Sequence, residues 1–220
     1  ERYYLQLEEL PGGSFPDAAR RRIALRRGLA QAEGLGQRQR YREAAELLES
    51  LRHHYPREAD VWAASSEVRA QLGQGSIALE YAEQGLRLAP TSDRLHLARA
   101  RALAKLGRYQ EAQRALAAAQ EYVDPSQLAR VAEELERTRA RADRERWNQE
   151  GRLDLVYLSL AEEYQRAPGD ADTLKSIGYL YLRTQQYPEA RHFFERAARR
   201  APNDPDARLG LAYALRGEGD

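Results

Sequence analysis

Hydrophobic residues recur along this chain at helical spacing. Within residues 172–184, the apolar positions fall three or four residues apart, which is typical of one face of an α-helix; they are Leu174, Ile177, Leu180 and Tyr181. Pro188 fits the first turn of a second helix, because its missing N–H has no partner there. Pro202 ends that helix. The pattern predicts a helix, a tight turn and a second helix.

The same arrangement repeats with a period of 34 residues. Prolines and alanines at equivalent places show the period: Pro56 and Pro90, Pro168 and Pro202, and Ala44, Ala78 and Ala112. From Ala112 to Ala190 is 78 residues, so one repeat carries about ten extra residues. A helical hairpin with one apolar face cannot bury that face alone, and stacking on a neighbour can.

These residues resemble the tetratricopeptide repeat family. Residues 171–204 follow its pattern closely, with Ile177–Gly178, Tyr181, Ala190, Phe194 and Pro202 in the family's places. The resemblance implies an all-α solenoid, a right-handed superhelix of helix-turn-helix repeats. The implied repeats are 25–58, 59–92, 93–126, an atypical 127–170, 171–204 and a partial 205–220, in a single array 1–220. We expect residues 1–13 to end a preceding repeat and the chain to be a segment of a longer protein.

The atypical repeat contains a long charged helix. Asp124 and Pro125 form a helix start, and the helical pattern continues to about Gln149. Two interpretations of its charged faces stay open: a solvated overhang, or a spacer or docking element. Residues 153–160 alternate in a way that also suits a strand, but the turn at Gly151 and the proline at Pro168 favour a helix.

Composition argues against several classes of function. The chain has 35 basic and 34 acidic residues, a formal net charge of +1, which speaks against a dedicated nucleic-acid or anionic-membrane binder. No apolar run is long enough to cross a membrane, and there is no cysteine. The four histidines lack metal-site spacing. Gly73–Ala78 fits a dinucleotide-binding fingerprint, but a predicted helix precedes it instead of a strand. We expect no enzyme activity, metal or cofactor.

The family resemblance also implies a partner-binding groove lined by the first helix of each repeat. Carried onto this sequence, the groove residues are Arg94, Leu97, Arg101, Lys105, Lys175, Tyr179, Leu182, Arg183 and Tyr213. Tyrosine and arginine are the residues that most often carry binding energy at interfaces.

The predicted function is therefore a non-catalytic scaffold that binds another protein or a peptide in this groove. Arginine-rich, cysteine-free arrays resemble those of bacterial secretion and exopolysaccharide export, which favours a periplasmic segment of an envelope protein over a cytoplasmic one. The alternative is a regulatory module that binds a peptide or nucleic acid through the basic face Arg20–Arg27. The open ends of such an array also predict end-to-end self-association.

Overall fold

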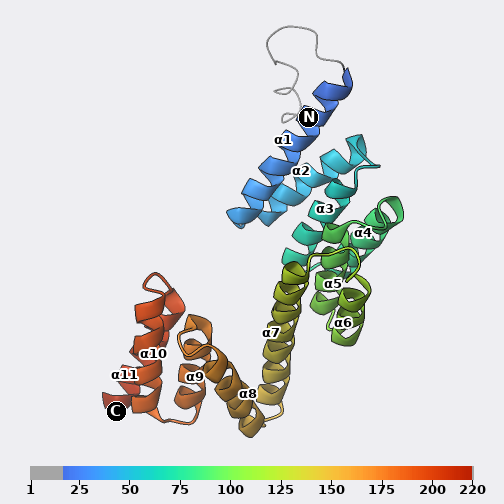
Figure 1. The fold of residues 1–220 in the computed structure, drawn as a ribbon. Helices are drawn as coiled ribbons and strands as arrows, with labels where there is room; N and C mark the ends of the chain where they lie inside the picture. Colours follow the sequence, from blue (N-terminus) through green and yellow to red (C-terminus); the bar gives the residue numbers. More distant parts are fainter. Residues whose placement is uncertain (1–16, 220) are drawn as a thin grey trace. The chain divides into compact units, whose positions relative to one another are not determined.

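The computed structural model describes residues 17–219, and every regular element in that range is an α-helix (Figure 1). The helices are α1 (Asp17–Gln37), α2 (Tyr41–His54), α3 (Ala59–Gln71), α4 (Gly75–Leu88), α5 (Asp93–Lys105), α6 (Tyr109–Ala118), α7 (Pro125–Gln149), α8 (Leu153–Arg166), α9 (Ala171–Arg183), α10 (Tyr187–Arg200) and α11 (Pro205–Gly219). The expected all-α class is confirmed. The proposed repeat end at 1–13 lies outside the described residues.

The chain forms two compact units, Glu1–Arg139 and Ala140–Asp220. Unit 1 holds α1 to α6 and most of α7, and unit 2 holds the end of α7 and α8 to α11. Within each unit, consecutive helices pack against each other as hairpins (Figure 1). The division into individual repeats stays a prediction.

The turns inside the hairpins share one backbone conformation. Among the described residues, positive φ occurs only at Gln39, Gly73, Gly107, Gly151 and Gln185, each just after the first helix of a pair. Their separations are 34, 34, 44 and 34 residues, the spacing that the prolines and alanines show. Glycine adopts this left-handed conformation without steric cost, whereas each glutamine pays roughly 1 kcal/mol.

A second repeated contact closes the junctions between hairpins. A side chain in the first turns of a helix bonds the carbonyl of the proline six residues before it. Trp62 Nε1 donates to Pro56 O at 2.8 Å, His96 Nε2 lies 2.8 Å from Pro90 O, and Arg208 donates to Pro202 O. Three different side chains therefore satisfy the same backbone group at equivalent positions.

Small residues sit where the helices of unit 1 approach most closely. Ala44, Ala78 and Ala112 are completely buried. On α4, Gly85 lies so near Leu95 that an added Cβ would be 2.5 Å from its side chain. Alanine and glycine at these crossings let neighbouring backbones come close, as the sequence pattern predicts.

Arg52 of α2 contacts aromatic rings on two other helices of unit 1. Its guanidinium carbon lies 4.9 Å from the ring centroid of Trp62 on α3 and 4.6 Å from that of Tyr81 on α4. The two rings meet edge to face, with centroids 5.6 Å apart. This cation–π arrangement adds to the apolar packing of the unit.

Phe194 of α10 is the centre of the packing in unit 2. Its side chain is completely buried, and the backbone at Gly178 of α9 and Gly210 of α11 makes room for it. A Cβ at Gly210 would lie 2.1 Å from the Phe194 ring. Phe194 therefore joins three consecutive helices, and it requires glycine on both sides.

The atypical region is helical throughout. The Asp124 side chain accepts a hydrogen bond from Ser126 N at 2.8 Å and so caps α7 as predicted. Residues 153–160 lie within α8, which confirms the helix over the strand. Trp147 near the end of α7 is partly buried against the core of α8 and α9.

Candidate functional site

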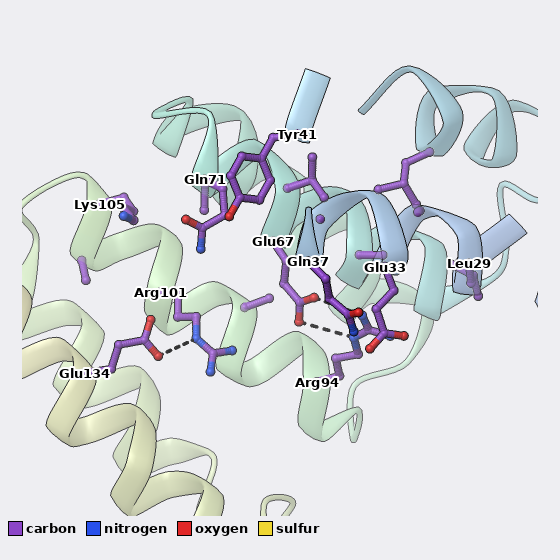
Figure 2. Close-up of a pocket in the computed structure, with 18 of the residues that line it drawn as sticks. Leu29, Glu33, Gln37, Tyr41, Glu67, Gln71, Arg94, Arg101, Lys105 and Glu134 are labelled. Atoms are coloured by element: carbon purple, nitrogen blue, oxygen red, sulfur yellow. Dashed lines mark hydrogen bonds and ion pairs between the residues drawn. The ribbon is translucent and has the colours of Figure 1, made fainter. Parts of the chain in front are cut away.

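Unit 1 contains a cavity of about 680 Å³. Its walls come mainly from α1, α3 and α5, with contributions from α2 and from the unit 1 part of α7 (Figure 2). These helices are far apart in the sequence, so the stacking of hairpins creates the cavity rather than any single element.

Part of the surface of the cavity is apolar. Helices α1, α3, α5 and α7 each contribute aliphatic side chains, among them Leu29, Ala64, Val68, Ala98 and Leu135. Several of these are nearly covered already, such as Ala98 at 1% exposure. A partner side chain entering here would bury apolar area on both surfaces, which favours binding.

Charged residues also line the cavity. Arg94 on α5 holds Glu67 on α3 through two contacts, Nη2–Oε2 at 3.0 Å and Nε–Oε1 at 3.4 Å. Burial by itself lowers the pKa of Arg94, but the hydrogen bond to Glu67 and the carboxylates of Glu67, Asp60 and Glu33 outweigh it and raise the pKa. Arg94 therefore stays charged and fixes the spacing of the two helices.

A second ion pair links α5 to α7. Arg101 Nε lies 3.0 Å from the Glu134 carboxylate. One turn later Lys105 lines the cavity, and on the α1 side Arg26 does the same. Neither Lys105 nor Arg26 has a carboxylate within 4 Å among residues 17–219.

Unit 2 has a smaller cavity of about 400 Å³, lined by residues of α7, α8, α9 and α11. Lys175 sits on it and is neutralised by two carboxylates, Asp172 at 3.0 Å and Asp204. The hydrogen bond from Lys175 lowers the pKa of Asp204. Tyr179 stacks edge to face on Phe194, with centroids 4.9 Å apart. Lys175 is thus occupied within the fold.

The predicted groove residues of α5 lie in two different environments. Arg94, Arg101 and Lys105 line the cavity of unit 1 together. Leu97 is 5% exposed and belongs to the core with Val131 and Leu135 of α7. Its placement on the groove surface is wrong, because α7 packs over that side of α5.

The predicted residues of unit 2 also have different environments. Lys175 and Tyr179 line the smaller cavity. Leu182 packs against the core around Phe194. Arg183 donates to Asn148 Oδ1 at 2.9 Å and to its carbonyl at 3.2 Å, near the C-terminal end of α7. Tyr213 is 52% exposed and does not line the cavity.

Sequence reasoning missed the contribution of α1. Arg26, Leu29, Glu33 and Gln37 line the cavity and follow one another at spacings of three and four. That spacing marks one helix face and was available in the sequence. The signal was weak because the family pattern is poorly matched there, and α1 begins at Asp17, before the predicted repeat.

The predicted basic face does not form one surface. A helix turns by about 100° per residue, so neighbouring arginines point in different directions. Arg22 and Arg26 lie one turn apart on the cavity side of α1, while Arg20 and Arg27 share another side. All four are exposed.

The remaining candidate motifs are structural in the described part of the chain. Gly73, at φ 75°, ends the turn after helix α3, so the strand required before a dinucleotide-binding turn is a helix. No three histidine or acidic side chains among the described residues are grouped as metal ligands. None of the described helices combines the length and apolar character needed to cross a membrane.

Two segments match models of the tetratricopeptide repeat, residues 29–93 and residues 171–214. The chain contains tetratricopeptide repeats. One matched segment lies in each compact unit, and the first supplies much of the cavity wall. These repeats typically mediate protein–protein interactions and generally form non-catalytic scaffolds.

Solved structures share this fold. A tetratricopeptide repeat protein from Parabacteroides merdae superposes with a TM-score of 0.56 at 16% identity, covering 97% of this chain and 80% of that one. A thermophilic protein with these repeats from Thermus thermophilus gives a TM-score of 0.50 at 20% identity, with 87% and 98% covered. No curated protein matches the chain significantly. The structural likeness supports the repeat fold.

Proposed function

We propose that this chain is a non-catalytic scaffold that holds a peptide segment of another protein in the cavity of unit 1. The observation that carries the proposal is the cavity itself, about 680 Å³ and lined by both apolar and charged side chains. Much of its wall belongs to the segment 29–93 that matches the repeat model, and the usual role of these repeats is to bind proteins.

The geometry supports a peptide over a compact small molecule. The cavity is an open surface feature whose walls run across several stacked helices (Figure 2). Extended or helical segments bind such grooves by placing apolar side chains in the middle and polar groups at the edges. The preformed ion pairs Arg94–Glu67 and Arg101–Glu134 keep the walls in place before a partner arrives.

A library of random peptides selected against the whole chain tests the proposal. Gln71 is exposed and lines the cavity, so Gln71→Trp fills the space without disturbing the core. Gln110→Trp on exposed α6 is the matched control. Selected peptides should lose binding to Gln71→Trp and keep it with Gln110→Trp. If no peptide is enriched, or if both variants bind the selected peptides equally, the cavity is not the binding site.

The finer predictions need their own tests. Secretion or exopolysaccharide export stays a prediction, which fractionation of the source cells with an antibody to this chain addresses. The alternative basic surface predicts binding to an oligonucleotide that weakens steeply with salt and with Arg20→Glu plus Arg27→Glu. The division of these arginines between two sides of α1 favours the cavity instead.

A further inference from the structure

The charges around the cavity of unit 1 are not balanced. Four cationic side chains line it, Arg26, Arg94, Arg101 and Lys105. The lining carboxylates are three, Glu33, Glu67 and Glu134. The four cations and three carboxylates of the lining therefore leave a net charge of one positive. The positions of the ion pairs determine which cations carry this excess charge.

Two of the carboxylates are used by the fold. Glu67 is held by Arg94 at 3.0 Å, and Glu134 by Arg101 at 3.0 Å. Figure 2 shows Glu33 and Glu67 gathered around Arg94, while Lys105 lies apart from the labelled carboxylates. Glu33 also contributes to the raised pKa of Arg94. Two of the three lining carboxylates thus lie near Arg94.

Among residues 17–219, Arg26 and Lys105 are the lining cations without a carboxylate within 4 Å. They belong to different helices, α1 and α5, and both are exposed. Arg22 lies one turn before Arg26 and extends the positive potential along α1. A cation at the edge of an apolar surface is only partly hydrated by its surroundings, which strengthens its attraction for an incoming carboxylate.

The apolar residues of the lining determine which other side chains of a partner fit the cavity. Leu29, Val68 and Leu135 come from three helices and line the same cavity. Each large aliphatic side chain of a partner that is fully buried here contributes about 1.5–3 kcal/mol to the free energy of binding. The charges of the lining determine which sign of charge the partner carries and how it is positioned along the cavity.

We infer that the segment bound in this cavity is an acidic peptide that places apolar side chains between carboxylates, and that Arg26 and Lys105 receive those carboxylates. The inference rests on the proposed function and adds the chemical class of the partner. Within the described part of the chain, a basic segment meets two cations that have no close carboxylate, and the lining carboxylates are already paired or near Arg94.

Three fluorescein-labelled peptides test the charge of the partner against the whole chain. They have equal length and the same leucine positions, and their remaining positions carry Glu, Lys or Gln. Fluorescence anisotropy gives the affinity of each. We expect the Glu peptide to bind about tenfold more tightly than the Gln peptide at physiological salt, with a larger difference at low salt.

Reversing the two cations provides the decisive comparison. Arg26→Glu plus Lys105→Glu should abolish the preference for the Glu peptide and give the Lys peptide the higher affinity. The control is Arg87→Glu plus Arg114→Glu, which changes the net charge equally at exposed positions of α4 and α6 outside the cavity. This control should leave the order of the peptides unchanged.

The outcomes separate this inference from the proposed function. Equal binding of the Glu and Gln peptides, tighter binding of the Lys peptide, no binding of any of the three, or an equal effect of both double variants overturns the acidic partner. If library peptides still lose binding to Gln71→Trp, the cavity remains the binding site with a partner of another charge. If they do not, the cavity itself is wrongly assigned.

Discussion

A buried ion pair in unit 2 gives the sharpest prediction about stability. Arg144 near the end of α7 is 8% exposed. Its Nη1 lies 2.9 Å from Glu163 Oε1 and 3.1 Å from Ser159 Oγ, both on α8. The guanidinium therefore connects the two helices where little water reaches it.

Removing one member of a buried pair costs more than the pair contributes, because the other charge stays behind without compensation. Such removals typically cost 3–5 kcal/mol. The Glu163 side chain keeps 21% exposure, so water compensates part of its charge. We therefore expect Arg144→Met to lower the free energy of unfolding by about 3 kcal/mol.

The chain offers a matched control on α8, the helix that carries Glu163. Arg166 and Glu162 of α8 form an i,i+4 pair at 3.8 Å, with side chains 76% and 70% exposed. Pairs of this kind contribute about 0.5 kcal/mol or less. Arg166→Met should therefore leave the free energy of unfolding nearly unchanged.

Tryptophan fluorescence can follow unit 2 by itself. The chain has two tryptophans, Trp62 in unit 1 and Trp147 in unit 2. In a Trp62→Phe background, Trp147 reports urea unfolding of its own surroundings, and linear extrapolation gives the free energy. Replacing both charges, with Arg144→Met and Glu163→Leu, should restore most of the stability because no buried charge is left unpaired.

Two results would refute this reasoning. If Arg144→Met destabilises no more than Arg166→Met, burial does not determine the strength of the pair. If the double replacement is as unstable as Arg144→Met alone, the loss comes from the packing of the arginine stem rather than from an isolated charge.

Three further predictions concern packing, pH and aromatic contacts. Gly210→Ala should destabilise unit 2 by about 1–3 kcal/mol in urea unfolding, because its Cβ would overlap Phe194, and Phe194→Leu in the same chain should recover part of the loss. The hydrogen bond from Lys175 lowers the pKa of Asp204, so this group stabilises the fold above its unfolded pKa and the contribution is lost as the pH falls through the lower folded value. The difference in unfolding free energy between the native chain and Asp204→Asn should therefore shrink between about pH 5 and about pH 3. Arg52→Gln should lower the stability of unit 1 by roughly 1–2 kcal/mol in thermal unfolding followed by Trp62 fluorescence, since it removes the cation between two rings.

The helices and their period could be predicted from the sequence because both depend on local properties. Apolar spacing defines each helix face, and proline and glycine mark where the helices end. The left-handed residues at Gly73, Gly107 and Gly151 occur with that same period. Even residues 153–160, whose alternation suits a strand, are helical, since the flanking turn and proline fix the context.

The tertiary structure decided which exposed faces become a site. Arg94, Arg101 and Lys105 could be placed together because they share one face of α5. Leu97 could not be placed correctly, because its burial depends on contacts with α7. The residues of α7 that cover it come more than 30 residues later in the sequence. The pairing of Arg101 with Glu134 also depends on that contact.

Local sequence thus determined that the chain folds into helical hairpins that repeat, because helix formation and termination depend on nearby residues. The cavity, its ion pairs and its uncompensated cations depend on contacts between residues of α1, α3, α5 and α7 that are distant in the sequence. Only the packed helices fix those distances, and distance decides whether two charges neutralise each other or one remains for a partner.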